Sequence, residues 1–165
     1  MKLRSFFFSL VLGGICLVAA STAWPLTVGL LAGAGGLGDE SFNDMLYAGL
    51  GKAQKIYQFK LIFEETGSAP ETQVAGMESL LSRGADVIFA NGANFTPLVD
   101  QYAERFPSKR FVLTDDASIQ RPNVAAMVFQ AHEGAFLAGV LAGRMTMSKR
   151  VGFIGGVDTA PVQAF

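Results

Sequence analysis

The chain has 165 residues, of which half are hydrophobic and 16% are charged, with 13 basic and 14 acidic side chains. This near balance of charge argues against a nucleic-acid-binding protein, which would carry a basic face. The single cysteine excludes an intramolecular disulfide and a cysteine-based zinc cluster, and the single histidine disfavours a histidine-rich metal site. The apolar content excludes a disordered chain, and the length fits one domain or one domain and part of another.

The first 23 residues are predicted to form a secretory signal peptide. Two basic residues near the start are followed by an uncharged apolar stretch at residues 6–20 and then by small residues, with cleavage expected before Trp24. The apolar stretch is shorter than the ~20 residues that a membrane-spanning helix needs, which disfavours a transmembrane anchor. Cys16 follows Ile15 in the middle of the stretch, so we expect no lipid anchor. These features predict a periplasmic protein.

Short apolar runs alternate with amphipathic stretches along the rest of the chain. We expect strands at residues 26–31, 59–63, 87–90, 110–113, 124–129 and 151–154, and helices at residues 41–57, 71–83, from 96 onward, and 134–147. This order predicts an α/β fold of right-handed βαβ units, with a parallel sheet and helices on both faces. Ligands of such sheets bind at the carboxyl ends of the strands, so the loops that follow the strands are the candidate functional regions.

The glycine-rich loop at residues 33–38 (GAGGLG) matches the G-x-G-x-x-G fingerprint of dinucleotide-binding proteins. Glu64 and Glu65 end the next strand, where a ribose-binding acid would stand. Asp39 and Glu40, however, place negative charge where a pyrophosphate needs the positive start of a helix. A dinucleotide-dependent oxidoreductase of the Rossmann type therefore remains only as an alternative.

The segment that follows this loop combines a carboxylate, a hydroxyl, an aromatic ring and an amide at one helix start. Phe42 would stack on a flat ligand, and Asp39 or Asn43 would bond to its polar edge. The alternative is structural: Ser41 caps the helix, with Asp44 three residues later as in a capping box, and Phe42 belongs to the core. The residues alone leave both interpretations open.

Polar residues also follow the later strands. Asn91 and Gly92 follow the third strand, Asp115 the fourth and Asp158 the sixth, and such residues are equally typical of turns. No G-x-S-x-G motif is present, and His132 has no obvious nucleophile to serve. We therefore expect a binding protein rather than an enzyme, with no cofactor and no metal.

Residues 35–43 (GGLGDESFN) resemble the G-D-x-S-F-N signature of the basic membrane protein (BMP) family. Members of this family are substrate-binding proteins of ABC transporters, and several bind purine nucleosides. Four later segments match further family motifs in the same order. They are residues 85–89 (ADVIF), 106–111 (FPSKRF), 133–139 (EGAFLAG) and 151–158 (VGFIGGVD).

This resemblance implies a type I periplasmic binding protein fold, in which two α/β lobes close on a ligand. Residues 24–130 would form the first lobe, and residues 131–165 the beginning of an incomplete second lobe, since such proteins are about twice this length. The resemblance also assigns roles: Phe42 would stack on the purine, Asp39, Ser41 and Asn43 would make polar bonds, Asp115 would bind the ribose hydroxyls, and Asn91 and Gly92 would line the cleft. Asp158, which takes the equivalent place after the sixth strand, is a further candidate ligand-binding residue.

The resemblance further implies a monomer that binds a small solute, most naturally a nucleoside, and that delivers it to an ABC permease of the inner membrane. Two other functions stay open at this point. One is an exported enzyme that acts on nucleosides, and the other is a truncated fragment that does not bind.

Overall fold

Strands and helices alternate through most of the chain in this computed structural model, which describes residues 25–156, 158, 160–163 and 165. The signal peptide predicted for residues 1–23 lies outside the described residues. The strands are β1 (Thr27–Ala32), β2 (Lys60–Glu65), β3 (Val87–Ala90), β4 (Arg110–Thr114) and β5 (Val124–Met127). The helices are α1 (Phe42–Tyr57), α2 (Pro70–Ser82), the short 3-10 helix η1 (Ala93–Phe95), α3 (Thr96–Arg105), α4 (Ala131–Met145) and α5 (Ala160–Gln163).

The strands form one five-stranded sheet in the order β2-β1-β3-β4-β5, and every neighbouring pair is parallel. β1 lies inside the sheet, where Leu30 stands opposite Phe63 of β2 and Phe89 of β3. All six residues of β1 are buried, as expected for an inner strand covered on both faces. The predicted parallel α/β sheet is confirmed.

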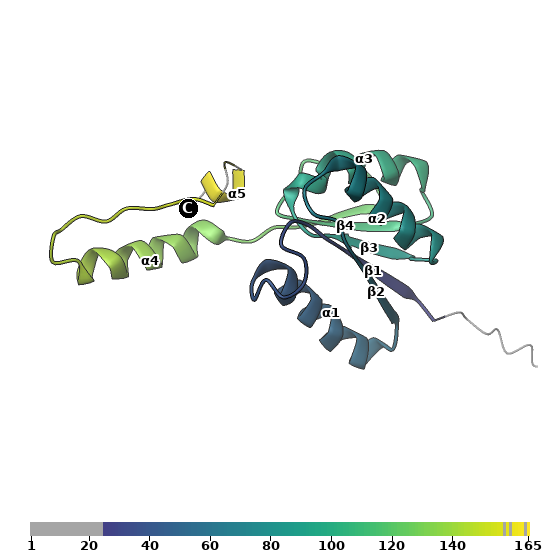
Figure 1. Ribbon diagram of the computed structural model, residues 1–165, viewed down its shortest axis with the longest axis horizontal. Coiled ribbons are helices and arrows are strands. Elements are labelled where there is room, and N and C mark those ends of the chain that lie inside the picture. Colours follow the sequence, from purple (N-terminus) through teal and green to yellow (C-terminus); the bar gives the residue numbers. More distant parts are fainter. Residues whose placement is uncertain (1–24, 157, 159, 164) are drawn as a thin grey trace, which may run out of the picture.

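Helices cover both faces of this sheet. α2 and α3 lie on one face and α1 on the other (Figure 1). In β3, Ile88 and Ala90 belong to the core under α2 and α3, whereas Val87 and Phe89 pack in the smaller core under α1. Alternate residues of one strand therefore supply both cores, as the two-residue period of a β-strand requires. Full burial of a leucine or isoleucine in such a core stabilises the fold by about 1.5–3 kcal/mol.

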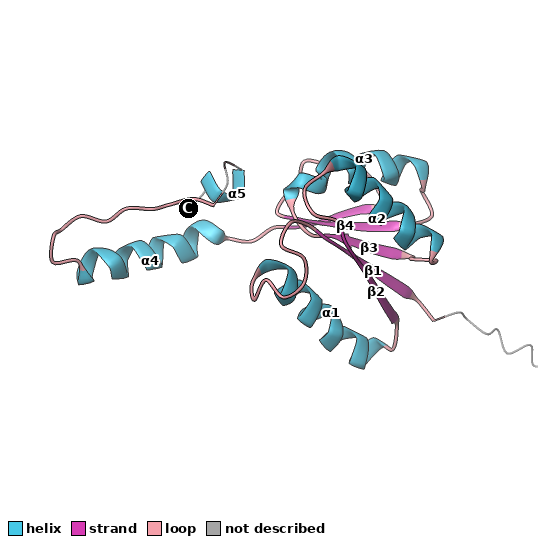
Figure 2. Cartoon of the chain, in the orientation of Figure 1, coloured by secondary structure: helices cyan, strands magenta, loops and turns pink. Residues whose placement is uncertain are grey.

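α4 extends away from the sheet, and the loop that follows α4 runs back beside this helix (Figure 2). None of the residues of α4 is buried, and Phe136, Leu137 and Leu141 are among the exposed apolar side chains of this helix. The prediction of a strand at residues 151–154 is wrong, because this segment has no strand structure. An extended segment becomes a strand only through hydrogen bonds to a neighbouring strand, and none of the described strands lies beside it. Within the residues that the structure describes, no helix has the length and apolar character needed to cross a membrane.

Candidate functional site at the carboxyl ends of β1, β3 and β4

A continuous row of hydrogen bonds joins the ends of β3 and β4 to the start of α1. The Thr114 hydroxyl donates to Asn91 Oδ1 at 3.0 Å, and Asn91 Nδ2 donates to Asn43 Oδ1 at 3.1 Å. Asn43 Nδ2 in turn donates to Asp39 Oδ2 at 3.0 Å. Thr114, Asn91 and Asn43 are all buried, with exposed fractions of 2–3%. We call these four residues the buried amide chain.

Asp39 ends the buried amide chain and also caps α1. Its Oδ1 accepts hydrogen bonds from the backbone N–H groups of Ser41 (2.9 Å) and Asp44 (3.2 Å), and its Oδ2 accepts from that of Asn43 (2.9 Å). The bonds from Asn43 and Ser41 hold the pKa of the Asp39 carboxyl below its ordinary value. The alternative interpretation, in which the Ser41 side chain caps the helix, is wrong, because this side chain makes no capping hydrogen bond. A carboxylate has two oxygens and a negative charge, so it satisfies more of the free N–H groups at a helix start than one hydroxyl can.

Three carboxylates of the chain itself occupy the N–H groups of the glycine-rich loop and helix start. Besides Asp39, the Asp44 carboxylate accepts from Gly38 N–H at 2.8 Å and from Glu40 N–H at 2.9 Å. Glu65 of β2 accepts from the N–H of Leu37. A bound pyrophosphate needs these same N–H groups and would meet three negative charges, so the geometry contradicts the dinucleotide alternative.

Phe42 is the exposed aromatic ring of this surface. Its side chain is 41% exposed, and it belongs to neither core cluster, contrary to the structural alternative. The ring lies against Gly92, since a Cβ placed on Gly92 would stand 3.6 Å from Phe42 Cε1. Gly92 has a φ of 124°, which favours glycine, and the Asn94 side chain also lies close, since its Oδ1 would stand 2.6 Å from the same Cβ. Phe42 therefore offers an exposed ring beside the Gly92 backbone and the Asn94 amide.

Asp115 supplies a carboxylate that is bound by none of the residues that the structure describes. The residue directly follows Thr114, takes a left-handed backbone conformation (φ 63°), and its N–H donates to Met127 O at 2.9 Å. Burial raises the pKa of its carboxyl, which makes no hydrogen bond or ion pair with any described residue. A strained, half-buried carboxyl with a perturbed pKa is typical of a functional site.

Asp116, the neighbour of Asp115, has a structural role instead. Its carboxylate accepts from Thr96 Oγ1 at 2.6 Å and from Ser118 N–H at 2.7 Å. The hydrogen bond from Thr96 lowers the pKa of the Asp116 carboxyl, in contrast to that of Asp115. Of the two adjacent acids, only Asp115 is therefore available to a ligand.

The structure brings most of the predicted site residues together. Asp39, Ser41, Phe42, Asn43, Asn91 and Gly92 lie at the ends of β1 and β3, and Asp115 lies beside them at the end of β4. Asp158 lies beyond α4, where its carboxylate accepts a hydrogen bond from Gln163 at 2.6 Å, and no described hydrogen bond links it to the strand-end loops. Thr114 was not among the predicted site residues, although a threonine at the end of one predicted strand and an asparagine directly after the preceding strand were a usable signal.

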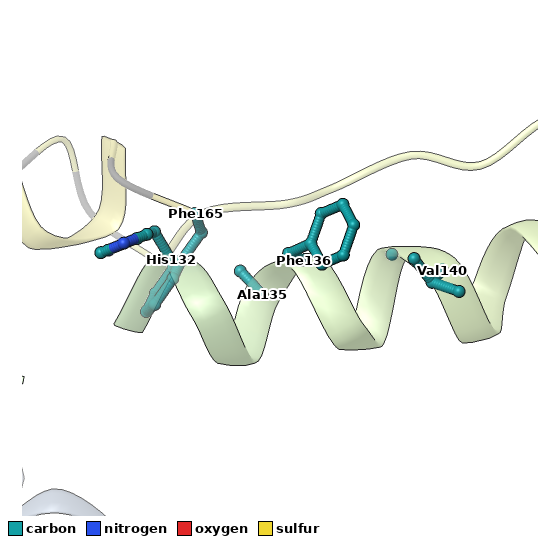
Figure 3. Close-up of a pocket in the computed structure, with 6 residues that line it drawn as sticks. His132, Ala135, Phe136, Val140 and Phe165 are labelled. Atoms are coloured by element: carbon teal, nitrogen blue, oxygen red, sulfur yellow. The ribbon is translucent and has the colours of Figure 1, made fainter. Parts of the chain in front are cut away.

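Two hollows lie elsewhere, along α4. Figure 3 shows one of them, with Phe136 and Val140 of α4 and with Phe165 beside His132. The other is lined by small and apolar residues of α4 together with Val151 and Phe153. Neither is lined by a carboxylate or an amide side chain, whereas small-molecule sites combine apolar walls with several converging polar groups. The strand-end surface is the better candidate on its chemistry.

Comparison with known proteins agrees with this geometry. Residues 27–165 match the Bmp family, described as "ABC transporter substrate-binding protein PnrA-like". The chain belongs to this family. Its fold is that of periplasmic binding proteins, and proteins of this family bind substrates for transport and are not enzymes.

Relatives and solved structures extend beyond this chain. Basic membrane protein A of Borreliella burgdorferi is 29% identical over 130 residues, which are 77% of this chain and 38% of that protein. An uncharacterized lipoprotein of Pyrococcus horikoshii is 32% identical over 145 residues, which are 85% of this chain and 36% of that protein. A crystal structure of an ABC transporter solute-binding protein from Aeropyrum pernix is 29% identical with a TM-score of 0.70, covering 85% of this chain and 40% of that one. The chain thus spans under half the length of these relatives.

Proposed function

We propose that this chain supplies the first lobe of the solute-binding component of an ABC uptake transporter, and that the solute is a purine nucleoside. In this proposal residues 24–130 form the lobe and residues 131–165 begin the second one. The ligand lies on the strand-end surface and the second lobe closes over it, with no covalent chemistry. The observation that carries the proposal is the Asp115 carboxylate, which no described residue binds, at the end of the strand next to the one that leads to Gly92 and the exposed Phe42 ring.

A nucleoside matches these two groups. Its flat, neutral base offers a π-face to the Phe42 ring, and stacking of this kind is worth about 1–3 kcal/mol per base. Its two neighbouring ribose hydroxyls both donate to the Asp115 carboxylate, and charge-assisted bonds of this type are about twice as strong as neutral ones. The Ser41 hydroxyl, which caps nothing, is free to bond to the edge of the base.

The other predicted site residues take a supporting role in this proposal. The polar atoms of Asp39, Asn43 and Asn91 are engaged in the buried amide chain, so these residues hold the surface in shape rather than contact the ligand. Asp158 comes from the segment beyond α4, and we place it on the opposite side of the cleft.

We also propose that the protein is exported through a cleaved signal peptide and works as a periplasmic monomer with an inner-membrane ABC permease. N-terminal sequencing of the exported protein should give Trp24 as the first residue. A mature protein that begins at a lipid-modified Cys16 would overturn this part, and the lipoprotein relative makes that comparison worthwhile.

Nuclear magnetic resonance tests the ligand assignment, because it detects the millimolar binding expected of one lobe. The 15N-labelled chain is titrated with adenosine, guanosine and inosine, and separately with adenine and with ribose. We expect nucleosides to shift the amide signals of Phe42, Gly92 and Asp115, adenine to shift mainly the first two, and ribose mainly the third. The amide signal of Arg105, in the last turn of α3 on the face of the sheet opposite α1, serves as the internal control and should not shift. No shift at these three residues with any nucleoside would overturn the ligand assignment.

A further inference from the structure

We propose that Thr114 is a positioning residue, which fixes Phe42 and Asp115 for ligand binding through the buried amide chain without contacting the ligand. The inference rests on the proposed function for what the two residues bind. The Thr114 side chain is buried (2% exposed), and its hydroxyl donates its one hydrogen to Asn91 Oδ1 at 3.0 Å. Thr114 is also the residue before Asp115, so its hydrogen bond to Asn91 links the segment that carries Asp115 to the residue that holds the Phe42 backbone.

Asn91 transmits the position of Thr114 to Phe42. Its Nδ2 donates to the backbone oxygen of Phe42 at 3.3 Å as well as to Asn43 Oδ1 at 3.1 Å. Gly92, against which the Phe42 ring lies, is the residue after Asn91. The Asn91 side chain therefore holds the backbone of Phe42, and the Asn91 backbone leads directly into the glycine against which the Phe42 ring lies.

All hydrogen bonds of the buried amide chain have the same donor-to-acceptor direction, from the Thr114 hydroxyl to the Asp39 carboxylate. If the Asn91 carboxamide rotated by half a turn, its oxygen would face the oxygens of Asn43 and Phe42, and both bonds that it donates would be lost. Asp39 fixes the direction, because an ionised carboxylate only accepts hydrogen bonds. Removing the Thr114 hydroxyl leaves Asn91 Oδ1 as a buried acceptor without a donor, which disfavours the orientation that holds Phe42.

Thr114→Val tests this role, since it removes the hydroxyl and keeps the size and β-branching of the side chain. The matched control is Thr66→Val: Thr66 is also buried (5% exposed), and its hydroxyl donates to Ala32 O at 3.0 Å, outside the buried amide chain. Both variants lose one buried hydroxyl, so both should lower the melting temperature by similar amounts. Thr114→Ser restores a hydroxyl and should rescue the first variant.

The decisive readout is made without any ligand. In the unchanged chain, the side-chain NH₂ signals of Asn43 and Asn91 should exchange with water far more slowly than that of the exposed Gln58. In Thr114→Val, exchange at Asn91 should rise about tenfold, as expected for the loss of one buried hydrogen bond, and the amide signal of Phe42 should shift. Thr66→Val and Thr114→Ser should leave both signals unchanged.

Nucleoside affinity is then measured on the same variants. We expect Thr114→Val to weaken binding about tenfold and Thr66→Val to leave it unchanged. The inference is overturned if Thr114→Val affects Asn91 and Phe42 no more than Thr66→Val does, or if Asn91 exchanges in the unchanged chain as fast as Gln58. The exchange result decides the inference even if no nucleoside binds, so its failure is distinguishable from failure of the proposed function.

Discussion

Gly76 and Gly49 should respond in opposite directions to the same substitution by alanine. Both lie inside helices, Gly76 in α2 and Gly49 in α1. A Cβ on Gly49 would meet nothing within 4 Å. A Cβ on Gly76 would lie 2.9 Å from Leu31 Cδ1 and closer still to Thr66 Cγ2, because α2 packs closely on the sheet at this glycine.

The change in the free energy of unfolding that each substitution causes follows from these contacts. Alanine inside a helix is favoured over glycine by about 1 kcal/mol, and Gly49→Ala should gain this amount in full. At Gly76 the same gain is opposed by overpacking, which costs about 1–3 kcal/mol in a well-packed core. We expect the upper part of that range, because Leu31 and Thr66 are both buried and the Thr66 hydroxyl is held by Ala32 O. Gly76→Ala should therefore destabilise the fold by about 1–2 kcal/mol.

Urea unfolding followed by circular dichroism measures both variants against the unchanged chain. The midpoint should rise for Gly49→Ala and fall for Gly76→Ala, with similar slopes. A rise of equal size in both variants would refute the reasoning, since it would mean that α2 does not pack on the sheet as closely as described.

Two further predictions concern the ligand surface. Phe42→Ala should weaken nucleoside binding by about 1–3 kcal/mol in calorimetry, whereas Phe63→Ala, which removes a ring of nearly equal exposure (39%) from the middle of β2, should leave it unchanged. Asp115→Asn should weaken binding about tenfold yet stabilise the free protein at neutral pH. Burial raises the folded-state pKa of Asp115 above its unfolded value, so the ionised carboxyl opposes folding at high pH, and the advantage of the variant should shrink as the pH falls through the folded-state pKa. Equal affinity of the Phe42 and Phe63 variants, or a less stable Asp115→Asn at pH 7, would contradict these expectations.

Much of the fold could be predicted from local pattern. The apolar runs that became β1 to β5 and the amphipathic stretches that became α1 to α3 carry their periodicity in neighbouring residues, and their order implies a parallel sheet. The segment at residues 151–154 has the same apolar character and was predicted as a strand for the same reason. It is not a strand here, because strand structure depends on a partner strand and periodicity says nothing about whether one is present.

The candidate site was likewise predictable only in part from local sequence. The sequence by itself determined which polar loops meet at the carboxyl ends of the strands, and its motifs indicated the family. Only the tertiary structure decided which of those polar groups are already engaged. Asp39 caps α1, and Asn43 and Asn91 bond to each other across 48 residues of sequence, whereas the Asp115 carboxylate is bound by no described residue and that of its neighbour Asp116 is engaged. A side chain is free or engaged according to partners that folding brings from distant segments, so no local pattern could separate the groups that hold this surface from those that face a ligand.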